Sequence, residues 1–318
     1  MIAQACEHTN RVKKGKTAAG TQRFLCKDCG QRFTESKPLD DARTNIDKAV
    51  MALNMLLEGM SIRATARLSG LDRKTIGRFV LSAGEACKQF MHDNIQNVEL
   101  DDIQLDELWS FVRMKQKAAQ KAAQKRECTD AFGDSYTFVA IDRETKLIPA
   151  FHVGKRTNEH TEMFLNKVAD AVDCTREFQV TSDGFHGYQY NVPFALGGKI
   201  HFAQLVKKYK SQQEETRYSP ATIMSAEKVV RFGNPEEDRI CTSHVERANL
   251  TIRMHLRRFT RLTNGFSKKQ EYHEAMQAIF FCNYNFVRKH SSIGMTPAMA
   301  AGLRAKPLTL KEILEQNV

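Results

Sequence analysis

Apolar residues recur at helical spacing along residues 45–92, and this pattern predicts three short helices. Each helix would begin at a residue whose side chain can accept a hydrogen bond from the first turn, and glycine would end two of them. The predicted caps are Asn45, Ser61 and Asp72, and the terminating glycines are Gly59 and Gly70. A helix, a glycine turn and a capped basic helix are typical of a helix-turn-helix unit.

The third of these helices, over residues 73–80, is the one expected to enter the major groove of DNA. The residues expected to contact DNA are Arg73, Lys74, Thr75 and Arg78. The residues expected to be buried inside the unit are Ala64, Leu68, Ile76 and Val80. A three-helix connector with solvated basic faces is the alternative interpretation of the same stretch.

Residues 100–210 alternate between strand and helix patterns. Period-two alternation predicts three strands that form a meander, then a helix and two further strands. The strands are expected at 103–112, 135–142, 147–153, 177–184 and 201–206, and the helices at 158–172 and 243–253, with a weak helical signal between the last two strands. This order is that of the ribonuclease-H-like fold, so the predicted class is α/β with a mixed sheet.

Three acidic residues fall where this fold brings its chain together. Asp106 lies in the middle of the first strand, where aspartate is disfavoured, Asp183 ends the fourth strand, and Glu246 lies on the late helix. Three carboxylates can hold two Mg²⁺ (or Mn²⁺) ions, one activating an attacking hydroxyl and the other stabilising the leaving oxygen of a phosphodiester. Taken singly, Asp183 is also compatible with a common Asp-Gly turn, and Asp106 with a solvated strand position.

Two arginines are expected to share the helix face of Glu246. Arg253 follows Glu246 by seven residues and Arg257 by eleven, which places both within about 20° of its direction at about 100° per residue. We therefore assign Arg253 to the catalytic constellation and Arg257 to the path of the DNA.

The charge balance favours a polyanionic partner. The chain has 318 residues, with 48 lysines and arginines against 37 aspartates and glutamates, a formal net charge of +11. Such an excess favours nucleic acid or an anionic membrane surface. No apolar run approaches the roughly 18 residues that span a bilayer, and the N-terminus lacks the regions of a signal peptide. We therefore expect a cytoplasmic, nucleoid-associated protein without a membrane partner.

The first 37 residues are basic and contain three of the eight cysteines. Cys26-Lys-Asp-Cys29-Gly30 is a zinc knuckle, Cys6 is a third ligand and His8 is the natural fourth, which predicts one structural Zn²⁺. A site closed by four protein ligands does no chemistry, so the basic residues around it would face phosphates. They are Arg11, Lys13, Lys14, Lys16, Arg23 and Arg32. A redox pair of Cys26 and Cys29 is the alternative, without a thioredoxin-like context to favour it.

Composition divides the chain into four parts. They are a zinc-ribbon-like head at 1–37, the helix-turn-helix at 45–92, a catalytic domain at 100–265 and a helical tail at 266–318. Within the catalytic domain, residues 211–242 are polar and are expected to be an insertion. The Lys/Ala/Gln repeat at 117–125 is expected to form a helical extension or a phosphate-contacting arm.

At these residues the chain resembles bacterial insertion-sequence transposases of the DDE class, nearest the insertion-element-one type. The matching motifs are Leu105-Asp106-Glu107-Leu108-Trp109, Ser182-Asp183-Gly184 with Tyr188, and Ser243-His-Val-Glu246-Arg-Ala-Asn249-Leu with Arg253. The head, the helix-turn-helix and the tail at 290–302 also fit, so the resemblance covers nearly the whole chain. The pair Cys6-Glu-His8 departs from the usual Cys-x-x-Cys of that family.

The resemblance implies that Asp106, Asp183 and Glu246 are the metal-binding triad. His244 and Asn249 lie beside Glu246 and are expected either to help position substrate or to be ordinary residues of the helix surface. The other acids nearby are expected to be structural or electrostatic. They are Asp101, Asp102, Glu107 and Asp142.

The sequence therefore predicts a DNA transposase. The head and the helix-turn-helix would bind the terminal inverted repeats of an element, and the metal site would cut its ends and join them to target DNA. Double-stranded DNA is the expected partner, and self-association is expected in the active complex because two ends must be brought together. The alternatives are a catalytically silent, transposase-derived DNA-binding regulator and a metal-dependent nuclease of the same fold without strand transfer.

Overall fold

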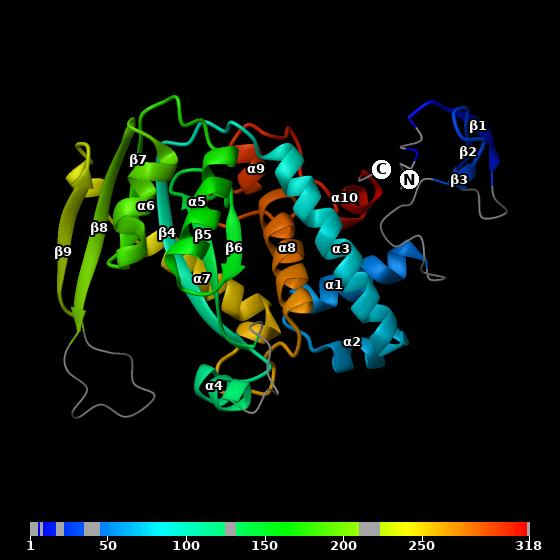
Figure 1. The fold of residues 1–318 in the computed structure, drawn as a ribbon, viewed down its shortest axis with the longest axis horizontal. Helices are drawn as coiled ribbons and strands as arrows, with labels where there is room; N and C mark the ends of the chain where they lie inside the picture. Colours follow the sequence, from blue (N-terminus) through cyan, green and yellow to red (C-terminus); the bar gives the residue numbers. More distant parts are fainter. Residues whose placement is uncertain are drawn as a thin grey trace.

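The computed structural model describes residues 6, 9–16, 22–34, 45–124, 132–209 and 223–316. Near the N-terminus, three short antiparallel strands form a small sheet in the order β1-β2-β3 (Figure 1). The strands are β1 (Arg11–Lys16), β2 (Gln22–Cys26) and β3 (Arg32–Thr34). The turn between β2 and β3 places Gly30 at φ +70°, in the left-handed region that glycine tolerates. Predicted ligand His8 lies outside the described residues.

The three helices predicted between residues 45 and 92 are present, as α1 (Ile46–Leu57), α2 (Ile62–Ser69) and α3 (Arg73–Asn94). The three predicted caps are confirmed, because the side chains of Asn45, Ser61 and Asp72 each accept a hydrogen bond from a backbone amide of the first turn. Gly70 ends α2 in the left-handed conformation, at φ +69°.

Helix α2 buries a different face from the one predicted. Leu68 was expected to be buried but is 67% exposed, whereas Thr65 is fully buried. Ile62, Thr65 and Ala66 follow the i, i+3, i+4 spacing of one helix face and point inward, and Leu68 falls outside that stripe. The predictions for Ile76 and Val80 are confirmed, since both are buried on α3.

The centre of the molecule is a six-stranded mixed sheet in the order β6-β5-β4-β7-β8-β9. The strands are β4 (Asp102–Val112), β5 (Gly133–Asp142), β6 (Phe151–Gly154), β7 (Phe178–Asp183), β8 (Ile200–Tyr209) and β9 (Ile223–Phe232). The first three form an antiparallel meander, and β7 runs parallel to both β4 and β8. This arrangement is consistent with the ribonuclease-H-like order predicted from the sequence.

Helices cover both faces of this sheet. They are α4 (Gln116–Gln124), α5 (Asn158–Ala171), α6 (His186–Leu196), α7 (Ser243–His255), α8 (Gln270–Phe286), α9 (Pro297–Ala300) and α10 (Leu310–Gln316), with 3₁₀ turns η1 (Glu237–Arg239) and η2 (Arg257–Phe259). Figure 1 shows α5 and α6 in front of the sheet and α7 behind it, where α7 packs against β4 and β5. The weakly predicted helix between the last two expected strands is α6, of 11 residues.

Strand β9 lies within the segment expected to be an insertion. It pairs antiparallel with β8 and extends the sheet at its edge. Nearly every described side chain of β9 is exposed, so no alternating apolar pattern marks it in the sequence. Residues 211–222 of the same segment lie outside the described residues.

One continuous apolar core joins the N-terminal helices to the sheet. The long helix α3 crosses α8 so closely that a Cβ atom on Gly84 would lie 2.5 Å from the Cβ of Ala275. This crossing fixes α3 to the helices that cover the sheet. Among the described residues, no helix is long and apolar enough to cross a membrane.

Candidate catalytic site

Two neighbouring parallel strands bring acidic side chains together. Strand β4 pairs with β7 only as far as Leu105 and Ser182. Asp183 ends β7 one residue later, while β4 continues through Asp106 and Glu107. Because β4 has an open edge beyond Leu105, side chains from both of its faces reach the end of β7. A carboxylate oxygen from each of Asp106, Glu107 and Asp183 lies within 4.8 Å of the others.

The Asp106 and Asp183 carboxylates are held by backbone and amide donors. Asp106 Oδ1 accepts from the amide of Glu107 at 2.8 Å, and its Oδ2 accepts from Nδ2 of Asn249 at 2.7 Å. Asp183 Oδ1 accepts from the amide of Phe185 at 2.9 Å, which closes the turn into α6. Both side chains therefore have fixed orientations before any ligand arrives.

Glu107 belongs to this cluster, although the sequence analysis gave it only a structural or electrostatic role. Its side chain is 2% exposed and forms an ion pair with Arg156, whose Nε lies 3.0 Å from Oε2 of Glu107. The same guanidinium lies 3.7 Å from Oδ2 of Asp183 and stacks 4.1 Å from the centre of the Phe185 ring. Arg156 thus bridges two of the three carboxylates.

Glu246 approaches the cluster from α7 but is not part of it. Two contacts join α7 to β4. Oε1 of Gln104 accepts from the amides of His244 and Val245, at 2.9 and 3.2 Å, and Asn249 donates to Asp106. The Glu246 carboxylate itself accepts from the Thr242 hydroxyl at 2.7 Å and pairs with the Lys207 ammonium of β8. Its side chain is therefore engaged with Lys207 of β8 and with Thr242.

Of the two arginines expected on the face of Glu246, one is on the helix and one is not. Arg253 lies on α7, and its guanidinium interacts electrostatically with Asp106. Arg257 lies beyond the end of α7, because the chain leaves helical geometry at Leu256 and enters η2. Leu256 and Phe259 are both buried, and their burial draws the chain out of the helix direction. The expectation that Arg257 shares the helix face is therefore wrong.

One arginine, Arg156, pairs with two of the three carboxylates, and burial together with repulsion among the acids still raises the pKa of Asp106 and of Glu107. Burial raises the pKa of Asp106 to about 7, and the Asp183 and Glu246 charges raise it in the same direction. Burial and the Asp183 charge raise the pKa of Glu107 to about 8, against the opposing effects of a hydrogen bond from Tyr188 and of the Arg156 charge. Burial alone would raise the pKa of Glu246, but hydrogen bonds from Lys207 and Thr242 outweigh it and lower that pKa. A cation placed among the first two groups would displace their protons near neutral pH.

Three of the four expected zinc ligands lie together in the head. Sulfur atoms of Cys6, Cys26 and Cys29 are within 4.8 Å of one another, and Cys6 Sγ is 3.7 Å from Cys26 Sγ. Two sulfurs bound tetrahedrally at about 2.3 Å from one ion would be about 3.8 Å apart. The cysteine geometry therefore fits a Zn²⁺ ion.

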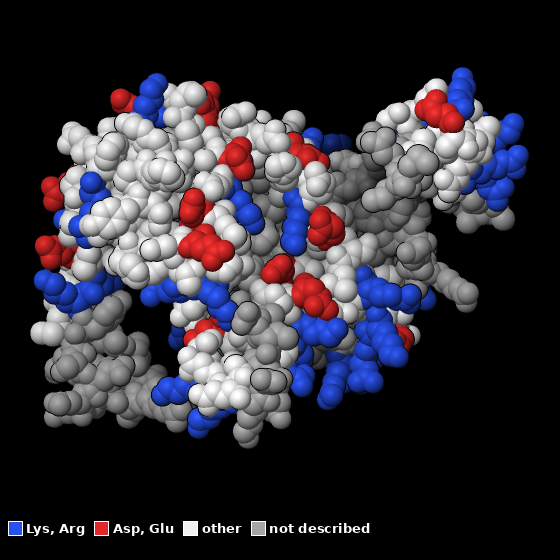
Figure 2. Space-filling model, viewed as in Figure 1, with Lys and Arg blue, Asp and Glu red and all other residues white. Residues whose placement is uncertain are grey.

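A basic surface covers α2 and the start of α3. Figure 2 shows lysine and arginine side chains gathered at the lower right, over these two helices. Predicted DNA-contacting residues Arg73, Lys74 and Arg78 are exposed there, and Thr75 is half-buried. Arg63 and Arg67 of α2 are exposed as well, although the sequence analysis did not single them out.

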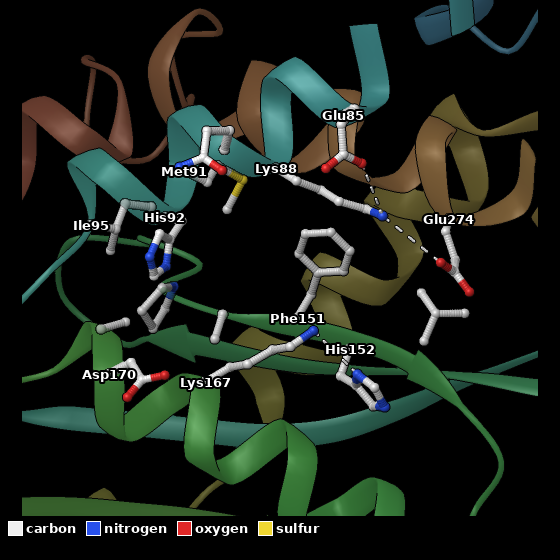
Figure 3. A pocket seen from close by; sticks show the side chains of 15 residues that line it. Glu85, Lys88, Met91, His92, Ile95, Phe151, His152, Lys167, Asp170 and Glu274 are labelled. Atoms are coloured by element: carbon white, nitrogen blue, oxygen red, sulfur yellow. Dashed lines mark hydrogen bonds and ion pairs between the residues drawn. The ribbon is translucent and has the colours of Figure 1, made fainter. Parts of the chain in front are cut away.

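A cavity of about 400 Å³ lies away from the carboxylates, between α3, α5 and β6. Figure 3 shows two lysines of its lining in contact with other lining residues: Lys88 reaches Glu85 and Glu274, and Lys167 Nζ lies 3.3 Å from Nδ1 of His152. None of the residues assigned to catalysis lines it. Size alone does not make this cavity the catalytic site, because the convergent carboxylates lie elsewhere.

Comparisons with known proteins give no family for the chain. No family model matches it. Among solved structures, the chain is similar to piggyBac transposase in a synaptic complex with hairpin DNA, with a TM-score of 0.36 and 11% sequence identity. The match covers 86% of this chain and 70% of that one. A likeness this distant identifies neither a family nor an activity.

Proposed function

We propose that this chain is a DNA transposase that cuts and joins DNA with the help of divalent cations bound at the carboxylate cluster. The observation that carries the proposal is the convergence of Asp106, Glu107 and Asp183 within 4.8 Å, on two adjacent strands of the predicted fold. Buried acids repel one another, so holding them together lowers the stability of the fold, and a bound cation offsets this loss. A catalytically silent regulator has no use for this arrangement.

The donor set fits Mg²⁺ or Mn²⁺, which prefer carboxylate oxygens. Two oxygens on opposite sides of one Mg²⁺ are about 4.2 Å apart, close to the 4.8 Å limit of the cluster, so small side-chain movements suffice. We assign Asp106 and Asp183 as the central ligands. When bound, such ions activate a hydroxyl nucleophile and stabilise the leaving oxygen of a phosphodiester.

Glu246 is the proposed third acid, and it must leave Lys207 to take that role. Helix α7 is already held beside the cluster by Gln104 and Asn249, so the change needed is a rotation of one side chain. Glu107 keeps its ion pair with Arg156, and that pair holds Arg156 next to Asp183. Arg156 lies beside Asp183, and Arg253 interacts electrostatically with Asp106. From these positions both arginines can bind the phosphates of the substrate.

DNA recognition is assigned to the basic surface of α2 and α3. The exposed side chains at the start of α3 lie at the end of the helix that such units insert into the major groove. The head would add phosphate contacts, and a Zn²⁺ ion on its three cysteines and His8 would hold it folded. Synapsis of two element ends implies self-association of the active protein.

The test is cleavage and joining of linear DNA that carries the ends of the encoding element, in Mg²⁺. Wild type should cut at the ends and join the freed 3′-hydroxyls to target DNA, and Asp106→Asn and Asp183→Asn should lower the rate at least about 1,000-fold. Asp101→Asn is the matched control, because Asp101 is an exposed acid just before β4 and pairs with Arg176. Specific binding without cutting by wild type would favour the regulator, and cutting that ignores the ends would favour a nuclease.

Glu107→Gln and Glu246→Gln, assayed in parallel, separate the two candidates for the third acid. The assignment predicts that Glu246→Gln abolishes cutting while Glu107→Gln retains a measurable part of it. The reverse order would make Glu107 the ligand.

A further inference from the structure

Leu262 is an apolar side chain that the fold holds in water. It is 79% exposed, and its backbone is left-handed at φ +59°. A bulky residue rarely adopts this conformation, which normally falls to glycine or asparagine. Asn264 and Gly265 follow two and three residues later, yet the left-handed position falls on Leu262. Strain of this kind is typical of functional positions.

The loop between α7 and α8, residues 256–269, is rigid around that leucine. Phe259 is buried and packs 5.3 Å from the ring of His273. Gly265 lies so close to the backbone that an added Cβ would be 2.7 Å from the carbonyl oxygen of Arg257. On the far side, Phe266 stacks 4.7 Å from Phe111.

Backbone contacts join the same loop to the end of β4. The amide of Arg113 donates to the carbonyl of Ser267 at 2.8 Å, and Val112 forms a β-bridge with Ser267. Within the loop, the Arg258 guanidinium donates to the Ser267 hydroxyl at 3.2 Å. The loop is thus anchored on both sides of its tip. The exposed Leu262 is a preorganised projection and not the product of a loose segment.

The loop that carries Leu262 is rich in basic residues. The loop contains five basic residues and no acidic one: Arg257, Arg258, Arg261, Lys268 and Lys269. Four of these, all but Arg258, are exposed, as is the adjoining Arg113. An apolar tip framed by cations is complementary to a polyanion with an apolar interior, and a nucleic-acid duplex is such a partner.

The loop lies between the basic helices and the carboxylates. The turn after α1 packs on the end of α7, since a Cβ on Gly59 would lie 3.1 Å from the carbonyl oxygen of Met254, and His255 Nδ1 lies 3.2 Å from the carbonyl oxygen of Leu57. On the other side, Arg253 interacts electrostatically with both Arg261 and Asp106. A duplex bound over α2 and α3 therefore passes the loop as it approaches the site.

We propose that Leu262 is a DNA wedge, which enters a base step beside the scissile phosphate and unstacks it while Arg257 and Arg261 hold the flanking phosphates. This role rests on the proposed function of the site. Apolar side chains that enter base steps from such basic frames kink the duplex and expose its backbone. Leu262 is thus a positioning residue, acting on the shape of the substrate and not on the reacting atoms.

The experiment uses end DNA in which single adenines near the cut are replaced by 2-aminopurine, whose fluorescence rises when it unstacks. Binding is measured in EDTA, without cleavage. Wild type should raise the fluorescence at one or two adjacent positions. Leu262→Ala and Leu262→Gly should abolish that rise with less than about a threefold change in affinity, while Leu262→Phe keeps it. Leu262→Gly relieves the left-handed backbone strain, and Leu262→Phe keeps an apolar side chain, so the two variants separate the side chain's effect from that of the backbone.

Cleavage provides a second readout. Leu262→Ala should cut fully paired DNA about 10- to 100-fold more slowly, and a mismatch at the wedged step should restore the rate, because a mismatched step is already partly unstacked. Met163→Ala is the matched control, since Met163 is an exposed apolar residue on α5. It should leave both readouts unchanged.

Several results would overturn the wedge. An unchanged fluorescence rise in Leu262→Ala would do so, and so would a mismatch that does not restore the rate. A Leu262→Ala variant that unstacks DNA normally but loses self-association would assign the tip to a second copy of the chain. One that unstacks DNA normally but loses binding to anionic phospholipid vesicles would assign it to a membrane surface. The failure of one proposal can be distinguished from the failure of the other. If wild type unstacks DNA in EDTA but never cuts it in Mg²⁺, only the proposed transposase activity is refuted. If wild type cuts DNA without unstacking that depends on Leu262, only the proposed wedge is refuted.

Discussion

Replacing Glu107 by glutamine should stabilise the protein at alkaline pH when no divalent cation is added. The side chain is 2% exposed and shares its site with two other carboxylates. Its pKa is raised from 4.5 to about 8 by burial and by Asp183. The folded protein therefore holds this proton more tightly than the unfolded chain does. Stability is then highest below about pH 4.5 and is lost as the pH rises through about 8.

The size of the effect follows from the pKa. A difference of about 3.5 pH units corresponds to about 5 kcal/mol at about 1.36 kcal/mol per unit. This value is a ceiling, because the charges of Asp183 and Asp106 both contribute to the raised pKa of Glu107, and neighbouring acids that interact share their titration. We expect Glu107→Gln to gain about half of it, ~2 to 3 kcal/mol, at pH 9. At pH 4.5 the variant and wild type should differ by less than about 0.5 kcal/mol.

The assay is urea unfolding at pH 4.5 and pH 9, without added Mg²⁺ and again with it. Glu162→Gln is the control, because Glu162 is an exposed acid on α5. Mg²⁺ should shrink the difference between Glu107→Gln and wild type at pH 9, since the cation neutralises the same repulsion. Equal stabilities at pH 9, or an equal gain in Glu162→Gln, would refute this account of the cluster.

Three other predictions concern separate parts of the molecule. Cys29→Ser should lower bound zinc from about one ion per chain to none by elemental analysis, with Cys174→Ser as the unaffected control; zinc retained by Cys29→Ser would contradict the head site. Arg73→Ala should weaken DNA binding and reduce the slope of log affinity against log salt by about 1 in an anisotropy titration, and an unchanged slope would remove Arg73 from the phosphate path. Gly84→Ala should cost at least ~1 to 3 kcal/mol of unfolding free energy, because its Cβ would meet Ala275 at 2.5 Å, and a neutral result would mean that the two helices separate easily.

Much of the scaffold could be predicted because its signals are local. Asn45, Ser61 and Asp72 cap helices through their own first turns, and neighbouring residues suffice to identify such caps. Asp106 and Asp183 could be brought together because parallel neighbouring strands place their residues at one edge. Strand β9 escaped prediction because its side chains are exposed, so it carries no apolar alternation.

The composition of the site could be predicted less well, because it depends on contacts far apart in the chain. Alternation along β4 puts Glu107 on the face opposite Asp106, and only the open edge beside β7 lets it reach Asp183. Lys207 holds Glu246 across 39 residues, and Arg156 reaches Glu107 across 49. No spacing rule encodes such pairs. The end of α7 before Arg257 likewise depends on the burial of Leu256 and Phe259. No glycine or proline at this point of the sequence marks the end of the helix.

In the proposed site, Asp106 and Asp183 share a divalent cation. Crystals of the protein soaked in Mn²⁺, with diffraction recorded at the manganese absorption edge, test this sharing. We expect an anomalous peak in contact with carboxylate oxygens of both residues, and its loss in crystals of Asp183→Asn. The absence of a peak between these two side chains at millimolar Mn²⁺, or a peak that persists in Asp183→Asn, would contradict it.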